Sequence, residues 1–373
     1  MKTQAMKLGL GVLALGLCVA ALGQAPVITS FSQNGSLVCI NLAPGSVASV
    51  EWASAVTGPW QTNWAGLDAV MVDASGMIQV GVPMFYRVRG TPTFPGMTLI
   101  PAGLFTMGDT FTEGSSDELP LHTVYVSAFY MDRTEVTKAS WDSVYQWATN
   151  HGYSFDHAGS AKATTHPVHS VNWYDMVKWC NARSQKEGRT PAYYTDAGLT
   201  LVYKTGQFAA YANWNAGYRL PTEAEWEKAA RGGAGGKRFP WAVTNITHIL
   251  ANYNSSTAYA YDTSATRGYH PTFNDGVTPY TSPAGYFAAN TNGYGLYDMA
   301  GNVWERCWDR YGAYSSGSQT NPPGPVTGSF RVVRGGGWSY NAFNCRTAIR
   351  NNGYTASDTG NYIGFRSVLP PDQ

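Results

Sequence analysis

The sequence is poor in charged residues. Only 13% of its 373 residues are Asp, Glu, Lys or Arg, against about 25% in an average globular protein, and the formal net charge is +1. Such a chain offers no strong electric field to a nucleic-acid backbone or to an anionic membrane surface, so we expect neither as a partner. Because 44% of the residues are hydrophobic, the chain is neither a disordered tail nor a coiled coil.

Cysteine is scarce as well. Besides Cys18 near the N-terminus there are only Cys39, Cys180, Cys307 and Cys345, which are widely separated and form no Cys-x-x-Cys pair. The sequence therefore contains no zinc-finger-like pattern. Four cysteines permit two disulfides, but their spacing does not identify the pairs.

The sequence has one long hydrophobic run, residues 8–22, which follows two lysines and precedes small residues. This order is typical of a secretory signal peptide, and Ala21 and Gly23 predict cleavage before Gln24. The alternative is a membrane anchor, for which the run is short. We therefore expect a signal peptide at residues 1–23 and a secreted or periplasmic protein.

Glycine, proline and aromatic residues are plentiful, with 41 Gly, 20 Pro, 13 Trp and 24 Tyr, which predicts a loop-rich protein with aromatic cores. Short β-prone runs separated by turn pairs predict a small β-sandwich-like module over residues 24–90, with a structural or binding role. Residues 91–96 are the expected linker to a larger body over residues 97–369. The β-prone runs of the module are Leu37–Ile40, Val47–Trp52, Ala69–Val72 and Phe85–Val88.

Few regular elements are expected in the body. Capping residues predict three helices, beginning at Thr137, Asn172 and Thr222, and the last two are followed by Asp175 and Glu225 at the capping-box position. Strand-like runs occur at residues 331–333 and 363–368. This is the pattern of a loop-rich α+β body.

Several motifs of the body, in this order, resemble those of the formylglycine-generating enzyme (sulfatase-modifying factor) family. The resemblance covers residues 97–369 and implies that family's variant of the C-type-lectin fold. It also implies two structural calcium sites and, in active members, a copper(I) oxidase that converts a sulfatase cysteine to formylglycine. The motifs are Leu99–Gly103, Met107-Gly108, His122–Thr137, Arg219–Glu227, Phe239–Trp241, Asn292–Glu305, Arg334–Gly336 and Gly364–Arg366.

The resemblance implies eight calcium ligands, in keeping with the preference of calcium for carboxylate, amide and carbonyl oxygens. The alternative is that these groups only satisfy turns. For the first ion the expected ligands are the side chains of Asp298 and Glu305 and the carbonyls of Gly301 and Val303. For the second they are the side chains of Asn252 and Asp275 and the carbonyls of Tyr253 and Val277.

The copper site, in contrast, is incomplete. By resemblance, Cys345 occupies the second of two thiolate positions, but Tyr340 occupies the first. A phenol oxygen is a hard ligand and does not replace a thiolate for Cu(I). Copper is therefore not expected, unless Cys307 supplies the second sulfur, and the sequence leaves open whether the chain is an enzyme. Cys345 is otherwise a buried thiol.

Histidines offer two further alternatives. A hydrolase would pair Cys345 with His122, His166 or His169, and the last two histidines are also spaced as a metal-ligand pair. No nucleophile elbow accompanies them, and we expect structural roles for all three.

The segment from Ser339 to Tyr362 is rich in Tyr, Asn and Ser and contains no Trp, Lys, Glu, Gln or Met. It resembles the binding face of retroelement-diversified variable proteins with a C-type-lectin fold. Such a composition combines rigid aromatic area with adaptable hydrogen bonding, as antibody paratopes do. We therefore expect a calcium-stabilised domain that binds a protein, peptide or glycan; the alternative is a formylglycine-generating oxidase that uses Cys345. The expected ligand contacts are Trp338, Ser339, Tyr340, Phe343, Tyr354 and Tyr362.

Overall fold

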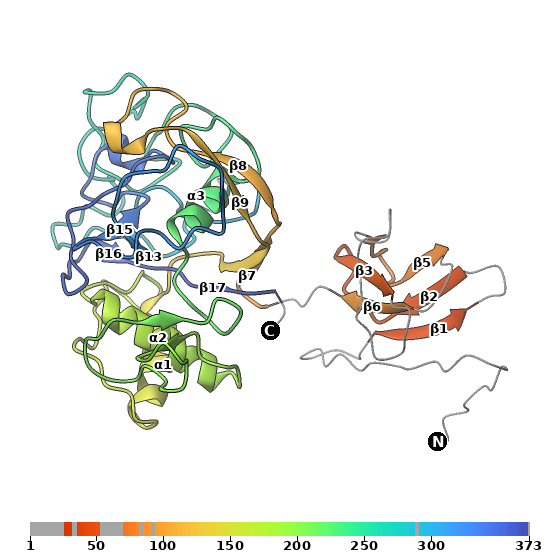
Figure 1. Cartoon of the computed structure of the whole chain (residues 1–373). Helices are drawn as coiled ribbons and strands as arrows, with labels where there is room; N and C mark the ends of the chain where they lie inside the picture. Colours follow the sequence, from red (N-terminus) through yellow and green to blue (C-terminus); the bar gives the residue numbers. More distant parts are fainter. Residues whose placement is uncertain are drawn as a thin grey trace. The chain divides into compact units, whose positions relative to one another are not determined.

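The chain divides into two units, residues 1–93 and 94–373, shown in a computed structural model (Figure 1). The predicted signal peptide and residues 91–93 of the predicted linker lie outside the described residues, so both assignments stay predictions. The structure describes residues 26–31, 36–52, 70–81, 86–90, 94–287 and 291–371.

The described part of the N-terminal unit consists of strands. They form two three-stranded antiparallel sheets, in the orders β1-β2-β5 and β4-β3-β6. Leu37 and Ile78 from the first sheet and Ala48 and Val50 from the second share one core cluster, as in a sandwich. Of the six strands, the sequence missed β1 and β5. The strands are β1 Val27–Phe31, β2 Ser36–Ile40, β3 Val47–Trp52, β4 Val70–Met71, β5 Ile78–Gly81 and β6 Tyr86–Gly90.

Three α-helices occur in the described part of the body, and all three confirm the capping analysis. The side chains of Thr137, Asn172 and Thr222 each accept a hydrogen bond from a backbone amide of the first turn. Gly232 ends the third helix in the left-handed region, with φ 59°. The helices are α1 Lys138–Thr149, α2 Trp173–Lys186 and α3 Glu223–Arg231, with short 3₁₀ helices η1 Ser116–Glu118 and η3 Ala342–Cys345.

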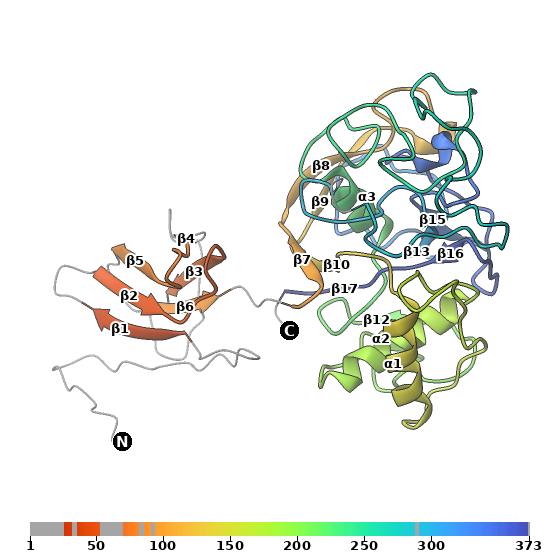
Figure 2. The ribbon, with the colours of Figure 1, turned by 180° about the vertical axis from the view of Figure 1, so that it is seen from behind.

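The strands of the body are short and form four small sheets, in the orders β17-β10-β7, β14-β9-β8, β15-β13-β16 and β11-β12. Because β7 and β17 both pair with β10, the beginning and the end of the body lie side by side (Figure 2). The strands are β7 Met97–Ile100, β8 Gly103–Met107, β9 His122–Val126, β10 Phe129–Asp132, β11 Tyr193–Tyr194, β12 Tyr211–Ala212, β13 Trp304–Arg310, β14 Gln319–Thr320, β15 Arg331–Arg334, β16 Ile363–Gly364 and β17 Val368–Leu369.

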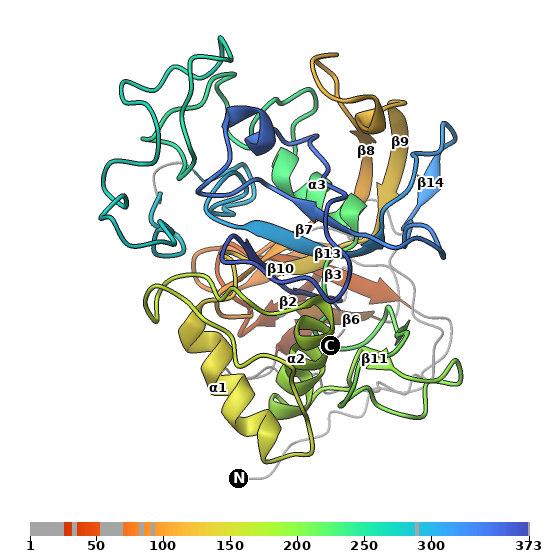
Figure 3. The same cartoon turned by 90° about the vertical axis from the view of Figure 1, so that its left-hand side faces the viewer.

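The helices lie on two sides of the β15-β13-β16 sheet (Figures 1 and 3). On one side α1 packs along α2, where the rings of Trp141 and Trp179 stack with centroids 5.9 Å apart. On the other side α3 packs against β8, β9, β13 and β15 through the buried Trp226. The predicted loop-rich α+β body is confirmed. Within the described residues, no helix is both long and apolar enough to cross a membrane.

Candidate ligand-binding face and cation sites

The segment with the predicted ligand contacts joins β15 to β16. It begins at two glycines in the left-handed region, Gly335 with φ 92° and Gly336 with φ 77°. A Cβ atom at Gly336 would lie 2.7 Å from the carbonyl oxygen of Asn344 and 3.0 Å from Cys345 Sγ. The segment therefore folds back on its own start, and this close approach requires glycine.

Three of the predicted contacts come together, and we call Tyr340, Tyr354 and Tyr362 the tyrosine face. The hydroxyls of Tyr340 and Tyr354 are hydrogen-bonded at 2.7 Å. The ring centroid of Tyr362 lies 5.7 Å from that of Tyr340 and 6.0 Å from that of Tyr354. All three side chains are half-buried, so each presents part of its ring to solvent. Burial raises the pKa of Tyr340, which keeps its hydroxyl a neutral donor at physiological pH.

The other aromatic contacts lie apart from this face. Phe343 stacks on Tyr259 with centroids 5.6 Å apart and lies under the Arg346 guanidinium at 4.1 Å. Trp338 is only 5% exposed, and its indole Nε1 donates to the carbonyl of Asn361 at 3.2 Å. A ligand would therefore contact little more than one edge of the Trp338 side chain. The neighbouring Ser339 is half-buried.

The four described cysteines are buried and unpaired. Cys345 packs in an apolar cluster with Phe239 and Ile246, whereas Cys307 belongs to a different cluster with Trp226. Burial raises the pKa of both thiols, so both are protonated at neutral pH. At the position of the first thiolate, Tyr340 has its hydroxyl bonded to Tyr354. This arrangement does not fit a Cu(I) dithiolate.

Buried carboxylates gather where the first calcium ion is expected. Glu305, which is 1% exposed, is held by two hydrogen bonds from Arg366 at 2.6 and 2.7 Å and one from Trp226 Nε1 at 2.7 Å. Asp298 accepts a hydrogen bond from the amide of Gly285 at 2.6 Å.

The sequence missed a third carboxylate of this group, Glu135, because it lies far from the motif that contains the other two. Glu135 is 1% exposed; its Oε1 accepts a hydrogen bond from Asn302 Nδ2 at 3.1 Å, and its Oε2 has no donor among the described residues apart from a proton shared with the neighbouring Asp298 carboxyl group. Burial and then the charge of Asp298 raise the pKa of Glu135 well above its usual value, and burial also raises the pKa of Asp298.

A divalent cation stabilises buried carboxylates that lack enough positive partners. The charges of the residues expected at the first calcium site are therefore compatible with calcium. Three carboxylates there face the single guanidinium of Arg366. In the described residues, however, no three His, Cys, Asp or Glu side chains are arranged as a complete metal site. A calcium ion would therefore also need the carbonyl oxygens of Gly301 and Val303, as the resemblance implies.

Three of the four oxygen donors expected for the second ion already have protein partners. Lys162 Nζ donates to Asp275 Oδ1 at 2.6 Å and to the carbonyl of Val277 at 3.0 Å. The carbonyl of Tyr253 lies 3.1 Å from His248 Nε2. The amide nitrogen of Asn252 donates to another carbonyl at 2.8 Å, and its Oδ1 has no partner in the described residues.

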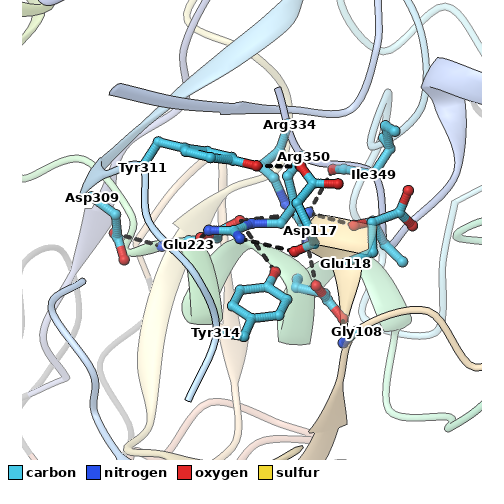
Figure 4. Close-up of polar contacts among 12 residues, drawn as sticks. Gly108, Asp117, Glu118, Glu223, Asp309, Tyr311, Tyr314, Arg334, Ile349 and Arg350 are labelled. Carbon is cyan, nitrogen blue, oxygen red and sulfur yellow. Dashed lines mark hydrogen bonds and ion pairs between the residues drawn. The ribbon is translucent and has the colours of Figure 1, made fainter. Parts of the chain in front are cut away.

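Buried ion pairs also hold β15 and the segment that follows it, and we call them the arginine frame; Figure 4 shows Arg334, Arg350, Glu118 and Glu223 of this set. Arg350 binds Glu223 of α3 with two hydrogen bonds at 2.6 and 2.7 Å, and Arg346 binds Glu118 of η1 at 2.6 and 2.8 Å. The frame consists of Arg334, Arg346 and Arg350 with their partners Glu118, Glu223 and Glu227.

Arg334 links the frame to the segment's backbone. Its guanidinium contacts Glu227 of α3 and donates to the carbonyls of Ala348 and Ile349 at 2.8 and 2.5 Å. The positive charges of Arg350 and Arg334 keep the pKa of Glu223 below its usual value despite burial. The frame thus fixes the segment to α3 through Glu223 and Glu227.

The three histidines considered for catalysis have other partners. His122 Nδ1 bonds to the carbonyl of Pro120 at 3.0 Å, and His166 Nδ1 bonds to the Thr281 hydroxyl at 2.9 Å. His169 Nδ1 lies 2.9 Å from the Ser170 hydroxyl, its Nε2 has no partner among the described residues, and burial lowers its pKa to about 4. These contacts are those of structural histidines.

A hollow of about 440 Å³ opens beside β12, away from the predicted contacts. It is lined by Lys204, Phe208 and Tyr211 together with small and hydroxyl side chains. The ring of Phe208 is 55% exposed. The hollow is a second place where a ligand can be tested.

Comparison with known proteins identifies the family of the C-terminal body. Residues 86–370 match the family model of the sulfatase-modifying factor enzyme 1-like domain. The chain is 34% identical over 296 residues to the formylglycine-generating enzyme of Streptomyces coelicolor, which covers 74% of this chain and 90% of that enzyme.

Two solved structures are similar to the chain. Variable protein 1 of Treponema denticola is 28% identical with a TM-score of 0.56, covering 74% of this chain and 95% of that one. PvdO from Pseudomonas aeruginosa is 27% identical with a TM-score of 0.51, covering 73% of this chain and 93% of that one.

Proposed function

Since the chain belongs to the sulfatase-modifying factor family and has its C-type-lectin-like fold, we propose that it is a binding protein whose ligand contacts the tyrosine face. One observation carries the proposal. Where an active member has its first thiolate, Tyr340 donates or accepts a hydrogen bond with Tyr354 at 2.7 Å.

The chemistry of the two sulfur positions argues against oxidation. A neutral phenol binds Cu(I) poorly because the ion prefers soft thiolate ligands. The remaining sulfur, on Cys345, is 0% exposed and has a raised pKa. A buried thiol that stays protonated is neither a good ligand nor a good nucleophile.

The chemistry of the tyrosine face suits a protein, peptide or glycan. Half-buried phenol rings supply contact area at little entropic cost, and their hydroxyls both donate and accept hydrogen bonds. Asn352 and Gly353, both exposed, lie next to Tyr354 in sequence and add polar contact area. Recognition by such a surface depends on shape and hydrogen bonding more than on charge.

Calcium at the first site is part of the proposal. Among the described residues Glu135 Oε2 has no donor apart from Asp298, and the pKa of Glu135 is raised; both observations support calcium, because a bound divalent cation would stabilise the charged carboxylates. Asp298 and Glu305 would hold the ion with side-chain oxygens. Its role would be structural, since it would brace the loop that leads into β13.

Secretion and diversification complete the proposal. The N-terminal sequence supports export. The resemblance of residues 339–362 to variable proteins, together with the likeness to Treponema denticola variable protein 1, supports diversification by a retroelement. A reverse-transcriptase gene nearby and an imperfect copy of the region that encodes residues 338–366 are expected; a genome with neither would contradict this part.

Binding is tested on glycan and peptide arrays with the full-length protein. We expect that Tyr340→Ala and Tyr362→Ala, which remove rings of the tyrosine face, lose the signals of the wild-type protein, while Phe208→Ala, which removes an exposed residue elsewhere, keeps them. If only Phe208→Ala loses the signals, the ligand binds in the hollow beside β12 and the proposal is wrong.

The second candidate, an oxidase acting on a sulfatase cysteine, is favoured by the 34% identity to a formylglycine-generating enzyme. Incubation of the full chain with copper(I), oxygen and a Cys-x-Pro-x-Arg peptide decides between the two. We expect the thiol to persist. Loss of the thiol with gain of an aldehyde, absent in Cys345→Ser, would establish the oxidase.

A further inference from the structure

Lys162 occupies the place expected for a cation. It lies in the loop between α1 and α2, yet its Nζ binds Asp275 Oδ1 at 2.6 Å and the carbonyl oxygen of Val277 at 3.0 Å. These oxygens are two of the four ligands that the family resemblance assigns to the second calcium ion. The ammonium also lies 5.6 Å from the ring centroid of Tyr280, within the range of a cation–π contact.

The other two expected ligands do not complete a calcium shell either. His248 Nε2 lies 3.1 Å from the Tyr253 carbonyl, and His248 Nδ1 lies 2.7 Å from the hydroxyl of Thr266. The side-chain amide of Asn252 is oriented by its hydrogen bond to the Tyr280 carbonyl. Only Asn252 Oδ1 is left without a partner among the described residues, and calcium requires six to eight oxygens.

The ligands expected for the second calcium ion differ in charge from those expected for the first. The only ionisable side chain of the second set is Asp275, and Lys162 already neutralises it. At the first site three carboxylates face one guanidinium. A divalent ion at the second set would have to displace the ammonium or lie beside a like charge.

We propose that Lys162 takes the place of the second calcium ion in this chain. Its ammonium ties the loop before α2 to the loop around Asp275, as a metal ion would, but without depending on the calcium concentration. The contact joins residues 113 positions apart in sequence. The proposal does not depend on the ligand of the tyrosine face.

The number of calcium ions per chain tests the proposal. Full-length protein is stripped with EDTA, titrated with CaCl₂ by calorimetry, and analysed for bound calcium. We expect Asp275→Asn to bind as many ions as the wild type, because Asp275 holds Lys162 rather than calcium. A loss of one ion in Asp275→Asn would overturn the proposal.

A second variant tests it from the other side. Lys162→Ala exposes the oxygens of Asp275 and Val277, and we expect it to bind one calcium ion more than the wild type and to melt lower in EDTA. Lys138→Ala is the matched control, because Lys138 also forms a half-exposed pair with an aspartate, Asp142, at 2.5 Å. Equal calcium numbers in Lys162→Ala and wild type would overturn the proposal; if that variant does not fold, Asp275→Asn decides.

Discussion

The tyrosine face and two arginines of the frame, Arg346 and Arg350, belong to the same segment of chain, but the face and the frame are built in opposite ways. The face is held by one hydroxyl pair and by ring contacts, and its side chains are half-buried. The frame is held by charged, two-pronged hydrogen bonds to glutamates 127 and 228 residues away. The difference indicates that the conformation of the segment is fixed by residues that a ligand does not touch.

The largest effect is expected from removing a frame arginine. Arg350→Ala leaves Glu223 buried without its two-pronged partner, which costs about 3–5 kcal/mol of unfolding free energy. Urea denaturation measures the loss. The surface pair of Lys138 and Asp142 is the control, and Lys138→Ala is expected to cost less than about 1 kcal/mol. A similar small cost for Arg350→Ala would refute the special role of the frame.

A pH effect of similar size is expected at His169, which is only 4% exposed and precedes Ser170, whose amide donates to the Gly360 carbonyl of the segment at 3.0 Å. Burial lowers its folded pKa to about 4 from an unfolded value near 6.5. Between these values the unfolded chain binds more protons, so stability is full above pH 6.5 and falls as the pH drops toward 4. The total is about 3 kcal/mol at 1.36 kcal/mol per unit.

The difference between variants isolates this histidine from other groups that titrate in the same range. Denaturation curves at several pH values should show a shallower acid loss for His169→Gln than for the wild type. His151→Gln, at an exposed histidine, should follow the wild type. Parallel curves for all three proteins would contradict the prediction.

Calcium removal is expected to weaken the region around β13 next. An ion that binds only the folded state stabilises it by about 2.7 kcal/mol at a concentration of 100 Kd. EDTA should therefore lower the melting temperature by several degrees, and Asp298→Asn should abolish the difference between EDTA and CaCl₂. An unchanged melt of the wild type with EDTA would rule out the proposed ion.

The smallest stability effect is expected on the face. Tyr354→Phe removes the hydroxyl bonded to Tyr340, and because both side chains are partly exposed, water replaces the partner at a cost below about 1 kcal/mol. The binding signal of Tyr354→Phe on the arrays should fall strongly, while its unfolding free energy should change little. A variant that unfolds as readily as Arg350→Ala would show that face and frame are one structural unit.

The local elements could be predicted from the sequence because their signals are local. The caps Thr137, Asn172 and Thr222 lie next to the helices that they begin. The family resemblance assigns Tyr340 to the first thiolate position by counting from the Gly-Gly pair, and this assignment stays a prediction. The convergence of three tyrosines on one face is consistent with the predicted ligand site, which stays a prediction.

The long-range partners could not be predicted. Glu135 joins Asp298 and Glu305, and Lys162 reaches Asp275, only because loops fold back over more than a hundred residues. The burial of Trp338 could not be predicted either. The sequence shows that residue 338 is a tryptophan, but not that its indole donates to the Asn361 carbonyl. The residue type indicates which ligands a side chain can bind, whereas the path of the loops determines which other residues it contacts.

The bond from the Trp338 indole to the Asn361 carbonyl joins two positions 23 residues apart and closes the segment at its base. Once the ends of a loop are pinned, its length matters little, since doubling it costs only about 0.6 kcal/mol in closure entropy. Insertions at the exposed Asn352-Gly353 turn should therefore be tolerated better than insertions between Arg346 and Arg350, which the buried ion pairs of the frame hold in place. Descendants of this chain have room to acquire new specificities by changing the size of the loop as well as its side chains.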